Sequence, residues 1–392
     1  MRRALTTAAA AATTRTTTRT TTIFSPASQP TATTTIPHRP RLPAAPQHPF
    51  FPAARVAMSS SSPSTTTTTP APSARDDRGA VLKRPVRIAC VQLSSGPDKA
   101  ANLSRARARV LSAARDGGAH VVVLPECFNS PYGTAHFPAY AERLLPSPPP
   151  ADVSPSYHAL AAAARDAGVY LVAGSIPELA LERDDDDKGG GEVKRYYNTA
   201  LVFSPAGDLL ATHRKVHLFD INIPGKITFR ESDVLSPGSG VTLVDLPPYG
   251  RVGVAICYDV RFPELAAVAS RRGAFALVYP GAFNLTTGPL HWELLARARA
   301  VDNQLYVALC SPARDLAEGA YHAYGHSLVA GPMADVLVEA GEGEETVYAD
   351  LRPEDIESAR SGIPLRTQRR FDVYPDVSQG RVKFTDPGAD GR

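Results

Sequence analysis

The chain has 392 residues, of which 43 % are hydrophobic and 21 % are charged, values typical of a globular protein. Its formal net charge of +3 is unevenly placed, because residues 1–75 contain eight arginines, no lysine and no acidic residue. Subtracting these eight from the 42 basic residues leaves 34 against 39 acidic ones, a net charge of about −5. We therefore expect neither a nucleic acid nor a membrane as a partner.

Residues 1–80 are rich in Thr, Ser, Ala and Pro and have almost no apolar periodicity. Such a segment buries too little surface to offset its ordering entropy, so we expect a disordered leader and linker. Arginine and hydroxyl residues without acidic ones are typical of an organelle transit peptide. The Thr and Ser content favours the chloroplast stroma over the mitochondrion, a disordered tail without targeting function being the other reading. Met58 is a candidate start of a shorter, cytosolic form.

The rest of the sequence argues against a membrane span, a disulfide framework and a metal site. No apolar run approaches the ~20 residues of a membrane span, and we expect a soluble protein. Cys90, Cys127, Cys257 and Cys310 are far apart and form no CxxC pair. We interpret all but Cys257 as core residues. The ten histidines show no metal-binding spacing, so we expect no metal and no cofactor.

Residues 84–375 alternate between strand-like and helical patterns without a linker, which predicts a single α/β domain followed by a tail at 376–392. An acidic, Gly-rich insert at 182–192 indicates a solvated loop, and residues 204–208 and 331–335 have the composition of hairpin turns. The predicted strands are 86–93, 120–124, 169–176, 198–203, 209–213, 241–246, 251–256, 275–279, 304–309, 326–330, 336–339 and 346–350. The predicted helices are 102–116, 156–166, 265–272 and 292–300.

Cys257 lies where a predicted buried strand ends, in the stretch CYDVRFPEL at 257–265, and Pro263 begins the helix that follows. Backbone N–H groups near a helix start are free and the local potential is positive. We therefore expect an environment that favours the thiolate and can bind an oxyanion. The alternative is an inert, buried cysteine.

Three other segments place a chemically useful residue beside a strand or a Gly- and Pro-containing loop. Glu126 ends the apolar run VVVLPE at 121–126, where partial desolvation should raise the pKa of its carboxyl. Lys215 lies in HRKVHLFD at 213–220, just beyond a predicted strand. Glu231 lies in GKITFRES at 225–232, in a segment that reads as a loop and as a candidate lid. Taken singly, each of these residues is more often a surface side chain.

Together, these segments resemble the nitrilase superfamily of carbon–nitrogen hydrolases over about residues 84–374. The resemblance continues in YPGAFNLTTGPLHWE at 279–293 and RARAVDNQ at 297–304. It implies a nitrilase-type α-β-β-α four-layer sandwich that pairs into homodimers or larger homo-oligomers. It also implies that Cys257 is the nucleophile, Glu126 the general base and acid, and Lys215, with the N–H of Tyr258, the oxyanion stabiliser. Glu231 would position the substrate or Lys215.

Within the superfamily, the stretches 126–133, 213–232 and 280–293 are most similar to omega-amidase. That resemblance implies hydrolysis of the terminal amide of 2-oxoglutaramate or 2-oxosuccinamate, which yields a 2-oxo dicarboxylate and ammonia. Because such substrates carry a distant carboxylate, a cation should lie in the pocket. Arg261 is the candidate, with Tyr132 and Phe283 as walls; the alternative for Arg261 is an internal ion pair with Asp259 or Glu264.

Other readings remain open. Within the superfamily, the chain could instead be an amidase for deaminated glutathione, an N-carbamoyl-amine amidohydrolase or a true nitrilase. A different cysteine hydrolase would use His213 or His217 as its base. A binding or scaffold protein that has lost catalysis is disfavoured, because Glu126, Lys215, Glu231 and Cys257 are all present.

Overall fold

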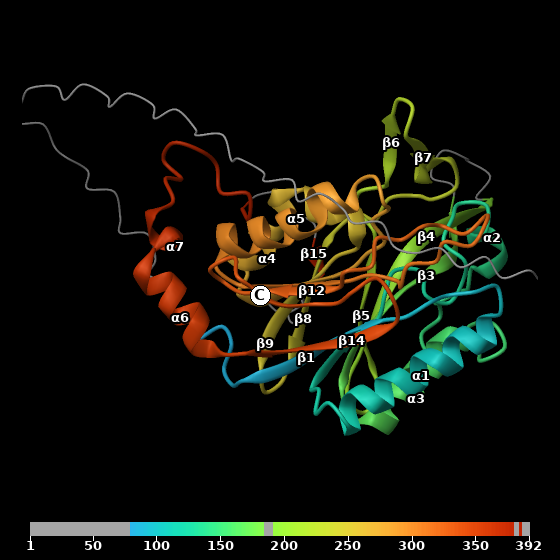
Figure 1. Cartoon of the computed structure of the whole chain (residues 1–392), viewed down its shortest axis with the longest axis horizontal. Helices are drawn as coiled ribbons and strands as arrows, with labels where there is room; N and C mark the ends of the chain where they lie inside the picture. Colours follow the sequence, from blue (N-terminus) through green and yellow to red (C-terminus); the bar gives the residue numbers. More distant parts are fainter. Residues whose placement is uncertain (1–78, 184–190, 380–383, 386–392) are drawn as a thin grey trace, which may run out of the picture. The chain divides into compact units, whose positions relative to one another are not determined.

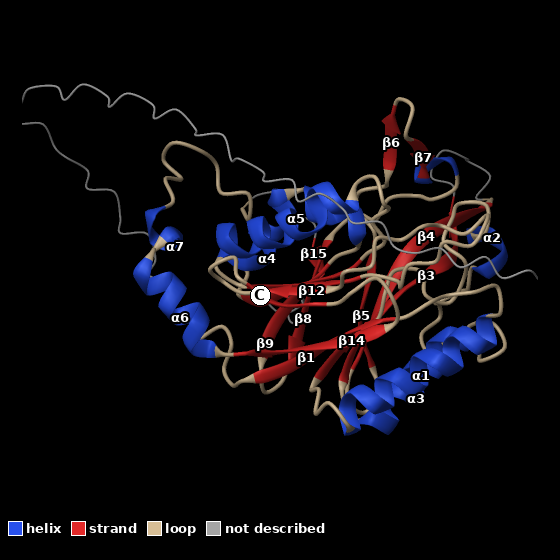
Figure 2. Cartoon of the chain, viewed as in Figure 1, coloured by secondary structure: helices blue, strands red, loops and turns tan. Residues whose placement is uncertain are grey.

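Two β-sheets packed face to face form the centre of the structure, a computed structural model that describes residues 79–183, 191–379 and 384–385 (Figure 1, Figure 2). These residues belong to one compact unit, Ala74–Arg392. The predicted transit peptide up to residue 78, with Met58, lies outside the described residues, as does the middle of the acidic insert, 184–190. Within the described ranges, no helix is long and apolar enough to cross a bilayer.

The first sheet has six strands in the order β14-β1-β2-β3-β4-β5. They are β1 (Val86–Gln92), β2 (Val121–Val123), β3 (Tyr170–Arg183), β4 (Glu192–Phe203), β5 (Leu209–Arg214) and β14 (Glu345–Leu351). Because β1, β2 and β3 pair in parallel, their carboxyl ends point the same way, and the segment that follows β2 emerges there. Strands β4 and β5 pair antiparallel across residues 204–208, which confirms the predicted hairpin.

The second sheet has seven strands in the order β13-β12-β11-β10-β9-β8-β15. They are β8 (Val241–Leu246), β9 (Gly250–Val254), β10 (Ala274–Pro280), β11 (Tyr306–Cys310), β12 (Leu328–Ala330), β13 (Val336–Glu339) and β15 (Phe384–Thr385). Strands β9, β10 and β11 are parallel, and Cys257 lies beyond the carboxyl end of β9. The predicted hairpin at 331–335 is confirmed by the antiparallel pairing of β12 with β13.

Helices cover the outer face of each sheet, which gives four layers (Figure 1). Helices α1 (Lys99–Arg115) and α3 (Pro155–Ala167) pack on the first sheet, and α4 (Pro263–Arg271) and α5 (Gly288–Asn303) pack on the second. Side-chain alternation along β1 explains the layering: Ala89 and Val91 join the core under α1 and α3, whereas Ile88 and Cys90 join the core that contains the second sheet. The predicted α-β-β-α sandwich is confirmed.

Helices α1 and α5 begin three and four residues earlier than predicted, each after a polar side chain that accepts hydrogen bonds from backbone N–H groups. The carboxylate of Asp98 accepts a hydrogen bond from the Ala101 amide at 3.0 Å, so α1 starts at Lys99 and not at residue 102. The Asn284 side chain accepts from the amides of Thr286 and Thr287, both at 2.9 Å, just before α5. The short helices α2 (Phe137–Tyr140), α6 (Pro353–Gly362) and α7 (Leu365–Gln368) were not predicted.

Two segments that were predicted to be loops contain strands. The ends of the acidic insert pair with each other, because β3 continues to Arg183 and β4 begins at Glu192. The segment before Glu231 forms a separate hairpin of β6 (Asp220–Ile223) and β7 (Ile227–Arg230), followed by the short 3-10 helix η1 (Glu231–Asp233). Apolar and polar residues alternate along both strands, as DINI and ITFR, and the turn between them contains Gly225 at a φ of 73°.

Candidate active site

Glu126 lies beyond the carboxyl end of β2 and is 1 % exposed. A glycine of β3 lets the chain at this point approach closely: Gly174 has a φ of 62°, and a Cβ atom there would lie 2.1 Å from the Pro125 oxygen. The next residue, Ser175, donates its amide to that oxygen at 3.2 Å and accepts the Cys127 amide at 3.0 Å. The turn that carries Glu126 is therefore fixed to β3 from both sides.

Lys215 lies just beyond β5 and reaches two carboxylates. Its Nζ donates to Oε1 of Glu126 and to Oε1 of Glu231, both at 2.9 Å, and all three side chains are buried. The preceding residue is fixed as well, because Arg214 pairs with Glu178 at 2.7 Å. Since an ammonium has three N–H donors, two bonds to carboxylates leave one donor for a further acceptor.

Glu231 is the first residue of η1 and is fully buried. Its Oε2 accepts the Phe219 amide at 2.8 Å, and its Oε1 accepts the hydroxyl of Tyr132 at 3.3 Å in addition to Lys215. The Glu231 carboxylate therefore links the residue before β6 to the residue after β7, and so closes the base of this hairpin.

Cys257 is the first residue of a 3-10 helix, η2 (Cys257–Arg261), and is 3 % exposed. Its φ of 46° is in the left-handed region, which is strained for a residue other than glycine. The loop after β10 approaches it closely: the Ala282 amide donates to Sγ at 3.4 Å, and a Cβ at Gly281 would lie 3.1 Å from the Cys257 Cα. Glu126 and Lys215 follow strands of the first sheet, whereas Cys257 follows the second sheet, so the cluster spans both.

The electrostatics of the cluster follow from one buried cation between two buried carboxylates. Burial raises the pKa of Glu126 and Glu231 adds to the rise, whereas Lys215 opposes it. The predicted upward shift of the Glu126 pKa is thereby confirmed. The pKa of Lys215 is also raised: burial lowers it, but the two carboxylates outweigh that effect.

The expectation that the surroundings of Cys257 favour its thiolate is wrong. Burial raises the pKa of the thiol well above its usual value, and the negative charge of Glu126 raises it further. Lys215 and the Ala282 amide act in the opposite direction but are outweighed. Proximity to a helix start does not compensate for removal from water beside two carboxylates. Cys257 is therefore a neutral thiol in the free protein.

The residues predicted to line a substrate pocket lie around this cluster. The Arg261 guanidinium carbon lies 4.7 Å from the ring centre of Phe283 and 5.4 Å from that of Tyr258. Its Nη1 donates to Nδ1 of His291 at 3.2 Å, and burial lowers its pKa. Among the described residues it forms no ion pair, so the alternative pairing with Asp259 or Glu264 is absent. Tyr132 contacts Glu231 through its hydroxyl and Tyr321 through its ring, and among the described residues it forms no hydrogen bond with Arg261.

Two residues near the cluster were missed by the sequence reasoning. Asn198 of β4 donates Nδ2 to Oε1 of Glu126 at 2.8 Å, so this oxygen has two donors, while Glu126 Oε2 has no hydrogen-bond partner in the described part of the chain. The ring of Tyr321 lies 4.3 Å from that of Tyr132, and its hydroxyl donates to the Ala282 oxygen at 2.7 Å. Asn198 could have been suspected as a polar residue at the start of the predicted strand 198–203, but nothing in the sequence around Tyr321 indicated its place in the site.

The alternative base, a histidine, finds no support in the geometry. His213 and His217 both face Asp259, at 3.2 Å and 2.7 Å, and neither contacts Cys257 among the described residues. The residues with described positions also contain no group of His, Cys, Asp and Glu side chains arranged to hold a metal ion.

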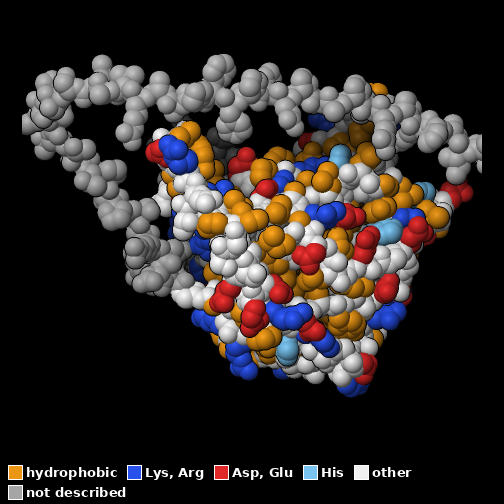
Figure 3. Space-filling view, turned by 60° about the vertical axis from the view of Figure 1, so that its left-hand side comes forward, with side chains coloured by type: hydrophobic (Ala, Val, Ile, Leu, Met, Phe, Trp, Pro, Cys, Tyr) orange, Lys and Arg blue, Asp and Glu red, His pale blue; other side chains and the backbone are white. Residues whose placement is uncertain are grey.

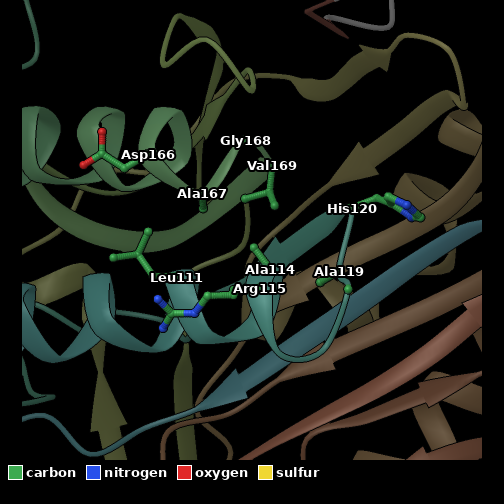
Figure 4. A pocket seen from close by; sticks show the side chains of 10 residues that line it. Leu111, Ala114, Arg115, Ala119, His120, Asp166, Ala167, Gly168 and Val169 are labelled. Atoms are coloured by element: carbon green, nitrogen blue, oxygen red, sulfur yellow. The ribbon is translucent and has the colours of Figure 1, made fainter.

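A cleft of about 390 Å³ lies elsewhere, between the carboxyl ends of α1 and α3 (Figure 4). Its lining includes His120 and Val169, which precede β2 and β3, whereas Glu126 follows β2. The cleft is therefore at the opposite end of these strands from the cluster.

The fold is that of the nitrilase superfamily. The crystal structure of Nit3 from Saccharomyces cerevisiae, a member of branch 10 of that superfamily, superposes with a TM-score of 0.64 at 49 % sequence identity. The match covers 74 % of this chain and 98 % of that one.

The chain belongs to the carbon-nitrogen hydrolase family, whose model matches residues 87–361, and it is a hydrolase that acts on carbon–nitrogen bonds. Omega-amidase Nit3 of Saccharomyces cerevisiae is 52 % identical over 300 residues, which are 76 % of this chain and 98 % of that protein. The hydrolase C26A3.11 of Schizosaccharomyces pombe is 53 % identical over 294 residues, 75 % of this chain and 85 % of that protein.

Proposed function

We propose that the protein is an omega-amidase that hydrolyses the terminal amide of 2-oxoglutaramate or 2-oxosuccinamate to the 2-oxo dicarboxylate and ammonia. The observation that carries the proposal is the buried cluster of Glu126, Lys215 and Cys257, with Glu231 behind it. The identity of about 50 % with proteins named omega-amidase supports this substrate class over others in the family.

The first half of the reaction forms a thioester. Glu126 accepts the proton of Cys257 as the sulfur attacks the amide carbon, and the developing oxyanion takes the remaining N–H of Lys215 and the amide of Tyr258. The Tyr258 amide has no acceptor among the described residues, as the orphan donors of a helix start should. The protonated Glu126 then donates to the leaving nitrogen, the C–N bond breaks, and ammonia departs.

The second half hydrolyses the thioester. Glu126, again a carboxylate, removes a proton from water, whose oxygen attacks the thioester carbon; the C–S bond breaks and the proton returns to Cys257.

The charge balance of the buried cluster favours both halves of the reaction. Proton transfer from thiol to carboxylate moves one negative charge from Glu126 to sulfur beside Lys215, so the net charge of the buried cluster does not change. Glu231 holds Lys215 in place throughout.

Arg261 is proposed to bind the distant carboxylate of the substrate, with Phe283, Tyr258 and Tyr132 as walls. Its guanidinium is half-buried, lies against two rings, and has no acidic partner among the described residues. A partly desolvated cation without a counter-ion gains more from an incoming carboxylate than a solvated one.

The function is tested by measuring ammonia release by the purified protein from a panel of substrates. We expect kcat/KM for 2-oxoglutaramate to exceed those for N-carbamoylputrescine, deaminated glutathione and an aliphatic nitrile by more than about 100-fold, because only the first combines a short chain with a terminal carboxylate. A higher value for any of the others would refute the substrate assignment and leave the family unaffected.

The subunits are proposed to form homodimers or larger homo-oligomers through α5. Leu290, Leu294 and Val301 are 60 %, 61 % and 38 % exposed, and their spacing places them on one stripe of the helix. Light scattering should give at least twice the monomer mass, and Leu290→Lys combined with Leu294→Lys should reduce it. A monomeric wild-type protein would refute this proposal.

No nucleic acid or membrane is proposed as a partner. On the face drawn in Figure 3, cationic and anionic side chains are interspersed, with no extended area of one sign. If the protein were retained on heparin at 0.1 M salt, where the Debye length is about 10 Å, a nucleic-acid partner would be supported instead.

The chloroplast stroma is proposed as the location, on the composition of residues 1–80 alone, with the mitochondrion and a cytosolic form from Met58 as alternatives. A fluorescent protein fused to residues 1–80 should enter chloroplasts. Cytosolic or mitochondrial fluorescence would contradict the proposal.

A further inference from the structure

Asp259 is a fully buried carboxylate that accepts four hydrogen bonds. Its Oδ1 accepts the amide of His217 at 2.9 Å and Nδ1 of the same residue at 2.7 Å. Its Oδ2 accepts the amide of Ile256 at 2.9 Å and Nε2 of His213 at 3.2 Å. Because a carboxylate only accepts, both imidazole nitrogens that face it carry a proton.

The four donors flank the two side chains at the centre of the reaction. His213 and His217 stand two residues before and two residues after Lys215, at the end of the first sheet. Ile256 immediately precedes Cys257, and Asp259 follows it by two residues, at the end of the second sheet. One carboxylate therefore joins the segment that carries the cation to the segment that carries the thiol.

Both ends of this connection are themselves fixed. The His217 ring stacks on Phe262 at 3.6 Å and 8° between planes, and Nδ1 of His213 lies 2.9 Å from the Thr242 hydroxyl of β8. At the far end of η2, the buried Arg299 donates to the carbonyl oxygens of Val260 and Arg261, at 2.9 Å and 3.0 Å. The turn that carries Cys257 is thus held by a buried anion at its start and a buried cation at its end.

An amide cannot replace the carboxylate in this role. In either orientation of an asparagine, its NH₂ group would face a backbone N–H that can only donate, that of His217 or that of Ile256. Burial raises the pKa of Asp259, but the hydrogen bonds from His213 and His217 and the Ile256 amide outweigh burial and hold it well below its usual range. The carboxylate is therefore ionised at neutral pH.

We infer that Asp259 is a positioning residue that sets the placement of Cys257 relative to Lys215. It touches neither the substrate nor the reacting atoms and acts through the two segments it joins. The inference rests on the roles proposed above for Cys257 and Lys215.

The test compares Asp259→Asn with a matched control, Glu142→Gln. Glu142 is also a buried carboxylate with four donors, from Lys99, Ser154 and twice from Ser156, none of which contacts the cluster. Both variants should lower Tm. Per folded protein, Asp259→Asn should lower kcat about 100-fold with KM within about 3-fold, the size of effect expected when reacting groups are misplaced by about 1 Å. Glu142→Gln should leave kcat within about 2-fold.

A second measurement needs no substrate assignment. The rate at which iodoacetamide labels Cys257, followed by mass spectrometry of its peptide, should fall about 10-fold or more in Asp259→Asn, because the thiol loses its alignment with Glu126. A purely structural role predicts the reverse, since a loosened fold exposes the thiol and speeds labelling. Equal kcat and equal or faster labelling per folded protein would overturn the inference.

If Asp259→Asn does not fold, Thr242→Val decides the question. It removes only the hydroxyl beside His213, and it should lower kcat and the labelling rate about 3- to 10-fold without changing KM. Unchanged values of both would overturn the inference. Failure of the proposed function is seen separately, as wild-type protein that labels readily but releases no ammonia from 2-oxoglutaramate.

Discussion

Replacing Glu126 by glutamine removes the proposed base with little change in shape. The Gln Oε1 can still accept from Lys215 and Asn198, which lie 2.9 Å and 2.8 Å from that oxygen in the wild type. The new NH₂ group takes the place of Oε2, the oxygen that has no partner among the described residues. What is lost is the ability to take up a proton.

The expected loss is large because Glu126 transfers protons in both halves of the reaction. General acid–base catalysis contributes roughly 10²- to 10⁴-fold, and we place Glu126→Gln at the upper end, roughly 10³- to 10⁴-fold in kcat. This is about 4 to 5.5 kcal/mol of transition-state stabilisation. KM should change by less than about 3-fold, since no contact to the substrate is removed.

The assay is steady-state ammonia release from 2-oxoglutaramate, with Glu142→Gln as the control for loss of a buried carboxylate. Mass spectrometry of the variant incubated with substrate adds a second readout: no acyl-enzyme should accumulate, because its formation already requires Glu126. Near-full activity would exclude Glu126 as the base, and an accumulated thioester would confine its role to the second half of the reaction.

Three further outcomes follow from the geometry. Arg261→Met should raise KM for 2-oxoglutaramate roughly 10- to 100-fold, the value of a charged hydrogen bond, with kcat within about 3-fold, and an unchanged KM would remove Arg261 from the site. Gly174→Ala should lower kcat about 10-fold or more, because its Cβ would lie 2.1 Å from the Pro125 oxygen and displace Glu126. Gly168→Ala is the control, because Gly168 also has a positive φ, 67°, but nothing lies within 4 Å of the Cβ position; it should lower stability by only about 1 kcal/mol. Equal losses of kcat in Gly174→Ala and Gly168→Ala would contradict this reasoning. On the acid side of its pH profile, kcat/KM should fall with an apparent pKa above the ordinary range of a glutamate, because burial raises the pKa of Glu126 and its protonated form cannot accept the thiol proton. An apparent pKa at or below ~4 would contradict this prediction.

The layers and the cluster could be predicted because they depend on local patterns. Buried strands are short apolar runs, and the residue beyond a parallel strand lies at the edge where chemistry is placed. Glu126 and Cys257 each follow such a run, whereas Lys215 follows the half-buried, antiparallel strand β5, so the convergence of all three was predictable only once the family resemblance was recognised.

The protonation of Cys257 could not be predicted in the same way. Its pKa depends on burial by segments from both sheets and on a carboxylate far away in the sequence. The hairpin of β6 and β7 was missed because its Gly and Pro residues are typical of a loop and its two strands have only four residues each. Tyr321 contributes one hydroxyl and one ring contact, neither of which leaves a pattern in the sequence.

Because the base and the nucleophile belong to different sheets, the enzyme is active only when the two sheets have docked. A folding intermediate with one complete sheet would contain either Glu126 and Lys215 or Cys257, never all three. Recovery of ammonia release during refolding therefore reports the final association of the two halves, later than the formation of secondary structure. The same separation links core packing to rate, since a side chain such as Val123 between the sheets helps to set how far the carboxylate lies from the thiol.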